Sequence, residues 1–205
     1  MSKLLVEAWD ERVSSALRER GWSALRLMDV TVYERRVGEC HNRFVADVIQ
    51  QASRIIPLPK VGVHYSEIKK VAEGVGWVGR NATATVGIDL IHLIRKIDGG
   101  SGATRWMLSD VGQIDATVDR LVGDLEMFGE PFYYEFSTID RLLSGYGDFT
   151  LSAPQRLEVA IAFSLRGKLQ AARRIVDGLK ADDSVVDMGL LNAIAAFDRS
   201  WRQYE

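Results

Sequence analysis

The side chains best suited to nucleophilic or metal chemistry are one cysteine and three histidines. Cys40 and His41 are adjacent, and His64 and His92 lie further along the chain. Zinc needs three or four such ligands in a tetrahedral arrangement, and neither a C-x-x-C nor an H-x-x-x-H spacing is present. Neighbouring side chains of a strand point to opposite faces, so Cys40 and His41 would not converge. We therefore predict no metal site, no cofactor and no catalytic residues.

A glycine-rich stretch is the second candidate for chemistry. Gly74, Gly76 and Gly79 lie in the segment EGVGWVGRN, which resembles a phosphate-binding loop. No Lys-Ser/Thr pair follows, and no G-x-G-x-x-G leads from a strand into a helix. The pattern favours a loop in which Trp77 packs against the body of the protein.

Four carboxylates accompany the most clearly defined helix of the chain. Asp115, Asp119, Asp124 and Glu126 lie off its apolar stripe, and Arg120 is one turn before Asp124. Paired acids could bind a cation or transfer protons. A charged outer helix face with an i,i+4 ion pair is the commoner arrangement, and we predict it here.

An aromatic cluster directly follows this helix. Phe132, Tyr133, Tyr134 and Phe136 come after Pro131. Such residues form either an interface hot spot or a core plug over one end of a sheet, and the sequence leaves both open. The acids beside them could steer a basic partner. The predicted partner-binding residues are Trp77, Asp115, Asp119, Glu126, Glu130, Phe132, Tyr133 and Tyr134.

The helix beside these residues has signals at both ends. Asp110 and Gln113 have the spacing of a capping box. Gly129 and Pro131 predict its end, since glycine adopts left-handed backbone and proline cannot continue a helix. The apolar stripe between them comprises Ile114, Val118, Leu121, Val122, Leu125 and Phe128.

Strands are predicted in the first half of the chain, after an N-terminal helix at 4–20 that ends at Gly21. The β-branched and aromatic runs lie at 30–33, 43–51, 60–65 and 83–93. Residues 43–56 also fit a helix capped by Asn42, and residues 86–97 a helix ending at Gly99. We favour a strand for the first of these segments because the strand-like runs on either side of it need backbone partners, and a strand for at least the first half of residues 83–93. Residues 98–104 are predicted to form a loop.

The last third of the chain has helical patterns only. Ser137 is expected to cap a short helix to Leu143, and Ser152 a helix that ends at Gly167 and forms a hairpin with the next one. A last helix is predicted from Ser184 to Trp201. The predicted fold is α+β, with the N-terminal helix on a roughly four-stranded antiparallel sheet and a C-terminal helical hairpin. Residues 1–148 would form the α+β domain and residues 149–205 a helical appendage; an all-α fold is the alternative.

Bulk composition limits the partners. The net charge is -2 with both signs interspersed, which argues against nucleic acid as a partner. No apolar run is long enough for a membrane span, and the N-terminal residues do not resemble a secretory signal. We therefore expect a cytoplasmic protein; the sequence does not indicate its oligomeric state.

Several short motifs resemble a bacterial family of small α+β proteins, the domain-of-unknown-function family 4304. They are VGE at 37–39, QQAS at 50–53, GVHY at 62–65, W-x-L-x-D at 106–110 and GEPF at 129–132. The resemblance covers about the first two thirds of the chain and implies no active residues. Proteins of this class resemble immunity proteins encoded beside bacterial toxins.

The function expected from these observations is non-enzymatic: an immunity-type protein that neutralises a cognate bacterial toxin by direct binding. One alternative is a small-molecule-binding domain with a pocket between sheet and helices. The other is a metal- or cysteine-dependent enzyme centred on Cys40 and His41.

Overall fold

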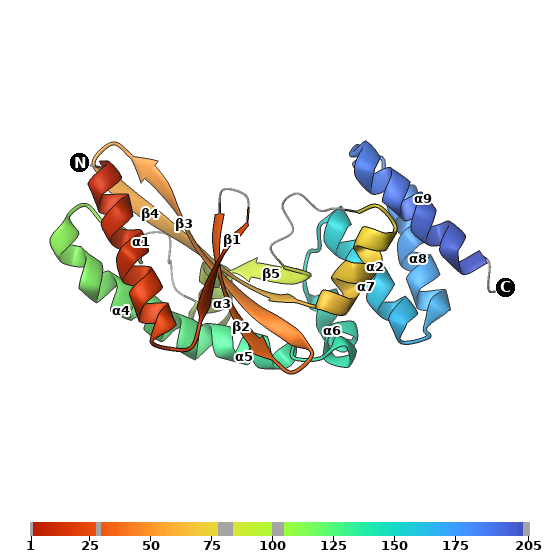
Figure 1. Ribbon diagram of the computed structural model, residues 1–205, viewed down its shortest axis with the longest axis horizontal. Helices are drawn as coiled ribbons and strands as arrows, with labels where there is room; N and C mark the ends of the chain where they lie inside the picture. The colour runs from red at the N-terminus through yellow and green to blue at the C-terminus, as the bar shows by residue number, and fades with distance from the viewer. Residues whose placement is uncertain (1, 28–29, 78–83, 100–104, 203–205) are drawn as a thin grey trace. The chain divides into compact units, whose positions relative to one another are not determined.

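The computed structural model describes residues 2–27, 30–77, 84–99 and 105–202, and they form two compact units (Figure 1). The first unit comprises Met1–Val37, His41–Val63 and Gly87–Tyr134, and the second Gly38–Cys40, His64–Val86 and Glu135–Glu205. These units differ from the predicted division at residue 148. The segment with helix α2 (Ser66–Gly74) joins the C-terminal helices because α2 packs on α7 (Ala153–Leu165).

A five-stranded antiparallel sheet dominates the first unit. Its strands follow one another in chain order: β1 (Ser23–Leu27), β2 (Val30–Val37), β3 (Cys40–Gln51), β4 (Arg54–His64) and β5 (Val86–Asp89). In the first hairpin Ser23 lies opposite Glu34 and Leu27 opposite Val30. The α+β class is confirmed, with five strands in place of about four.

The structure shows which of the segments that fit both a strand and a helix adopt each conformation. Residues 43–51 are strand, as predicted, because β3 lies between β2 and β4 and has backbone partners along both edges. Pro57 and Pro59 are inside β4 and would break a helix there. Residues 86–97 divide into β5 and helix α3 (Leu90–Asp98), which ends at Gly99 with φ +66°. Thr83 and most of the loop predicted at 98–104 lie outside the described residues.

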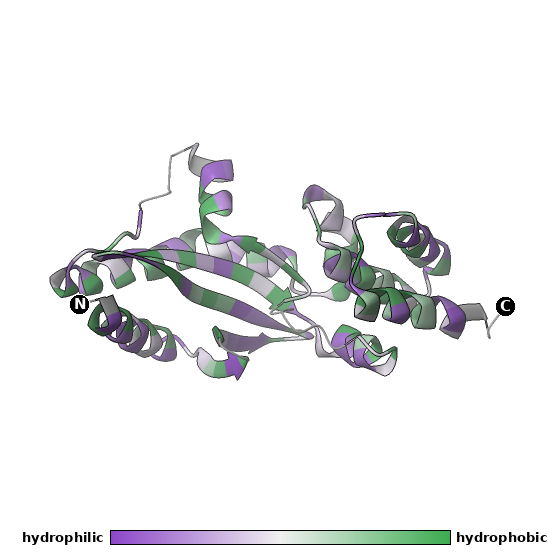
Figure 2. Cartoon of the chain, turned by 90° about the horizontal axis from the view of Figure 1, so that it is seen from above, coloured by the Kyte–Doolittle hydropathy of each residue, from purple (hydrophilic) through white to green (hydrophobic). Residues whose placement is uncertain are grey.

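The N-terminal helix packs by its predicted stripe. Helix α1 (Ser2–Arg18) buries Leu5, Trp9, Val13, Ala16 and Leu17. Figure 2 shows hydrophobic and hydrophilic residues alternating along the elements of this unit. The Trp9 indole N–H donates to the Ala46 carbonyl of β3 at 3.4 Å, so the helix is fixed to the sheet. Gly21 follows it with φ +78°.

The capped helix begins as predicted but does not end as predicted. The Asp110–Gln113 capping box is present, followed by a 3-10 turn (Val111–Gln113) and α4 (Ile114–Asp124). A π-turn (Leu125–Gly129) and α5 (Glu130–Glu135) then continue the helix past Pro131. The Glu130 N–H donates to the Leu125 carbonyl five residues back. This wider turn accommodates a proline that an α-helical turn would exclude.

The second unit is helical. Besides α2 and α7 it contains α6 (Ile139–Gly145), a 3-10 turn (Tyr146–Asp148), α8 (Leu169–Lys180) and α9 (Met188–Arg202). The helical hairpin of α7 and α8 is confirmed, with Ser152 in a capping box and Gly167 at φ +70° between the helices.

Two helix starts in this unit differ from prediction. Thr138, and not Ser137, caps α6 by accepting from the Arg141 N–H. Helix α9 begins at Met188, four residues after the predicted Ser184, because the Asp187 carboxylate accepts from the Leu190 N–H. No helix in the described part of the chain is long and apolar enough to cross a membrane.

Asp124 is a correction to the predicted outer face of α4. Its side chain is buried and accepts from both Arg105 Nε and Nη2, at 2.7 and 2.6 Å, and from the Trp106 indole N–H at 2.9 Å. This carboxylate therefore joins α4 to the segment that precedes its capping box.

We expect Asp124→Ala to lower the free energy of unfolding by about 2–4 kcal/mol, because a buried indole N–H and a partly buried guanidinium lose their acceptor. Urea unfolding followed by tryptophan fluorescence measures the loss. Asp119→Ala, which removes an exposed acid of the same helix, should cost less than about 1 kcal/mol. Equal losses for the two variants would contradict this role of Asp124.

Candidate interaction surface

The structure does not bring the cysteine and histidines into a reactive arrangement. Cys40 is fully buried, and its thiol donates to the Ser137 carbonyl at 3.5 Å. Burial, together with the nearby Glu39 carboxylate, raises the pKa of the Cys40 thiol to about 11. His41 instead lies against Glu34, with Nδ1 and Oε1 2.9 Å apart. At neutral pH Cys40 is therefore a protonated core residue and not an activated nucleophile.

The other candidate ligands are also dispersed. His92 is exposed, with Nδ1 3.5 Å from an Asp89 carboxylate oxygen. No group of three or more Cys, His, Asp or Glu residues in the described part of the chain could hold a metal ion. Of the glycine-rich stretch, Trp77 is buried in the second unit, as predicted, and Gly79 lies outside the described residues.

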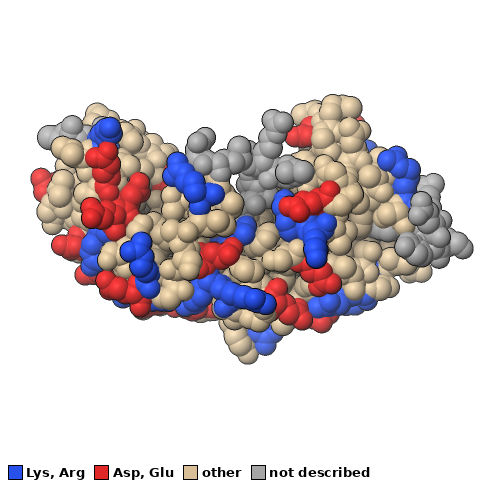
Figure 3. All heavy atoms as spheres, viewed as in Figure 1, with Lys and Arg blue, Asp and Glu red and all other residues tan. Residues whose placement is uncertain are grey.

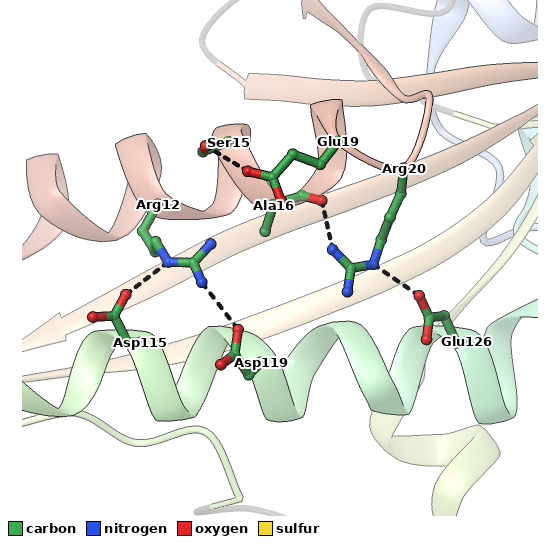
Figure 4. Close-up of polar contacts among 8 residues, drawn as sticks. All are labelled: Arg12, Ser15, Ala16, Glu19, Arg20, Asp115, Asp119 and Glu126. Carbon is green, nitrogen blue, oxygen red and sulfur yellow. Dashed lines mark hydrogen bonds and ion pairs between the residues drawn. The ribbon is translucent and has the colours of Figure 1, made fainter.

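The predicted acidic face of α4 is paired with Arg12 of α1. Arg12 Nε donates to Asp115 Oδ1 at 2.7 Å, and its Nη2 donates to Asp119 Oδ1 at 3.0 Å (Figure 4). One guanidinium thus bridges two acids that are one turn apart. The hydrogen bond to Asp115 raises the pKa of Arg12, with smaller contributions from the charges of Asp119, Asp115 and Glu19.

Two further ion pairs extend this row along the helix. Arg20 Nε donates to Glu126 Oε1 at 2.8 Å, and Arg35 Nη2 of β2 donates to both carboxylate oxygens of Glu130, at 2.6 and 2.8 Å. We call the pairs of Arg12, Arg20 and Arg35 with Asp115, Asp119, Glu126 and Glu130 the arginine ladder. Figure 3 shows acidic and basic side chains intermixed over α1 and α4. The face is therefore charged, as predicted, and carries both signs of charge.

Most of the aromatic cluster is core. Phe132 and Tyr133 of α5 are buried, and the Tyr133 hydroxyl donates to the Arg43 carbonyl of β3 at 2.9 Å. The Tyr133 ring lies 5.8 Å from that of Trp22. These two predicted partner-binding residues, like the predicted Trp77, are therefore buried and do not form part of an exposed surface. The sequence allowed either an interface hot spot or a set of core residues. These side chains are core residues.

Tyr134 is the exception, and it has apolar neighbours. It is 70 % exposed, and Met127 on the same continuous helix is 68 % exposed. Pro131, also exposed, lies between them. Spacings of four and three residues place Met127, Pro131 and Tyr134 on one side of the helix. We call these three residues the exposed strip.

The sequence did not single out Met127, Pro131 or the ladder arginines as candidate surface residues. Met127 had a signal, because it is an apolar residue off the buried stripe of the helix. The arginines had none, because Arg12 and Asp115 are 103 residues apart and meet only in the folded chain.

We expect Arg12→Gln to lower the free energy of unfolding by no more than about 1 kcal/mol, because its partners are largely exposed and screened by solvent. Urea titrations in low and high salt measure the effect, which should shrink as salt is added. Lys3→Gln, at an exposed pair on the same helix, is the matched control. A loss above about 2 kcal/mol that salt does not reduce would contradict a solvent-exposed ladder.

The Cys40 thiol should react very slowly with iodoacetamide at pH 8 in the native protein. With a pKa of about 11 only about one thiol in a thousand is ionised at that pH, and the sulfur is buried. Mass spectrometry of the alkylated protein checks this, with the urea-unfolded chain as the reactive control. Native modification as fast as that of the unfolded chain would disprove the burial of Cys40.

No family model, curated protein or solved structure matches this chain. The resemblance to family 4304 therefore rests on the short sequence motifs alone.

Proposed function

We propose that this chain is a non-enzymatic protein-binding module that uses the exposed strip to contact its partner. The observation that carries the proposal is the exposure of Met127 and Tyr134 on one helix side, at 68 % and 70 %. A large aromatic side chain and a flexible thioether are typical anchors of protein interfaces. The buried Tyr133 next to the strip fixes the helix, so Tyr134 is held in place before a partner binds.

The ladder defines the polar surroundings of the strip. Asp115, Asp119 and Glu126 each use one carboxylate oxygen for an arginine, and the second oxygen has no hydrogen bond within the described residues. All three carboxylates are more than half exposed. They can therefore accept from lysine or arginine side chains of a partner. The chemistry fits a partner with an apolar pocket bordered by basic groups.

The specific form of the proposal is an immunity-type protein that neutralises a cognate bacterial toxin in the cytoplasm. It is supported by the resemblance of the motifs to family 4304 and by the class likeness to immunity proteins. A toxin whose active surface binds a polyanionic or apolar substrate would present basic and apolar groups of the kind that the strip and ladder accept.

The test is affinity purification of the tagged protein from its native host, followed by mass spectrometry. We expect one stoichiometric partner that carries a toxic enzymatic domain. The double variant Met127→Ala/Tyr134→Ala should weaken that binding at least about tenfold, since each truncated interface anchor costs about 1–2 kcal/mol.

The control is Val186→Ala/Met188→Ala, which truncates two apolar side chains of the second unit that are also about two thirds or more exposed. It should retain the partner as the unchanged protein does. Absence of any partner above background, or equal retention by both double variants, would refute the proposal.

A further inference from the structure

A small pocket lies in the second unit, separate from the residues of the exposed strip. Its volume is about 150 Å³, and it is formed by α7, α8 and the segment that precedes α7. It is lined by Tyr146, Leu151, Arg156, Val159, Arg174, Ile175 and Gly178. The aliphatic side chains make its wall largely apolar, and two arginines border it.

The two arginines differ in their pairing. Arg156 Nη2 donates to the Asp182 carboxylate, whose pKa is lowered to about 2 by hydrogen bonds from Ser184 and Arg156. This pair is therefore neutral as a unit at any physiological pH. Arg174 has no hydrogen bond or ion pair with any described residue. The pocket thus has one uncompensated positive charge.

One lining residue, Arg156, also has a side-chain donor without a partner in the described part of the chain. The Arg156 Nε atom is buried and has no hydrogen-bond partner among the described residues. A buried donor without an acceptor is destabilising, and a ligand oxygen would remove that cost. Guanidinium groups bind carboxylates through charge-assisted hydrogen bonds, which are stronger than neutral ones.

The volume limits the apolar part of a ligand. An apolar protein cavity of about 150 Å³ accommodates one benzene ring. The missing side chain of Gly178 leaves one wall open, since a Cβ built there would meet no atom within 4 Å. The site is therefore wide enough for a ring-sized body with its acid group directed to the arginines.

We propose that this pocket binds a small organic monocarboxylate with an apolar body of about one ring. Arg174 supplies the charge, Arg156 Nε supplies a hydrogen bond, and Val159 and Ile175 contact the apolar body. This ligand site is independent of the partner-binding function, because it uses none of the residues of the exposed strip or the ladder.

The test uses sodium benzoate as the probe and the methyl NMR resonances of Leu151, Val159 and Ile175 as the readout. We expect saturable shifts confined to the residues around the pocket. Benzyl alcohol, which lacks the charge, and acetate, which lacks the ring, should bind at least about tenfold more weakly.

Two variants test the two halves of the site. Arg174→Gln should weaken benzoate binding at least about tenfold, and Gly178→Leu should abolish it by filling the pocket. Arg199→Gln, at an exposed position of α9 that does not line the pocket, should leave the affinity unchanged. The remaining methyl resonances report whether each variant is folded.

The proposal is overturned if benzoate gives no saturable shifts in the unchanged protein, or if folded Arg174→Gln or Gly178→Leu protein binds it equally well. Equal affinity for benzyl alcohol would show that the positive charge of Arg174 does not contribute to binding. If inorganic phosphate displaced benzoate at an equal concentration, the apolar ring would not contribute to binding.

Discussion

The burial of Tyr133 is the constraint on which the first unit depends. Its hydroxyl donates to the Arg43 carbonyl of β3, and its ring contacts Trp22, over which the Arg35 guanidinium lies at 4.7 Å from the ring centre. Arg35 in turn holds Glu130 one turn before Tyr133. This cluster fixes α5 to the sheet in one rotational setting. Phe132 and Tyr133 together define the buried side of α5, and Tyr134, about 100° further around the helix, faces solvent.

The π-turn connects this anchor to α4. An α-helix from the Asp110 capping box could not pass through Pro131 without losing a hydrogen bond and meeting a carbonyl of the preceding turn. The bond from the Glu130 N–H to the Leu125 carbonyl widens the turn and lets one helix serve two purposes. Its α4 part carries Asp115 and Asp119 of the ladder, and its α5 part carries the anchor Tyr133 and the exposed Tyr134. π-turns occur frequently at functional sites, which agrees with the placement of the exposed strip across this one.

Charge pairing determines how much of the acidic helix face is available. Three arginines oppose four carboxylates in the ladder, so this surface has little net charge although it is rich in acids. In the proposed function such a surface would select its partner through geometry and local pairing more than through long-range attraction, because opposite charges a few ångströms apart cancel at a distance. Specificity would then come from Met127 and Tyr134, with the acids acting as a rim.

The sequence by itself determined the features that depend on near neighbours: the capping box of Asp110, the helix start at Ser152, the stripe of α1, the turns at Gly21 and Gly167, and the α+β class. These follow from the hydrogen-bonding and backbone preferences of residues within about one turn of one another. Only the tertiary structure decided that 43–51 is strand, that Pro131 is inside a helix, that Asp124 and Tyr133 are buried, and that Arg12 pairs with Asp115. Each of these outcomes depends on a partner far away in the chain, and neither local propensity nor spacing contains the position of that partner.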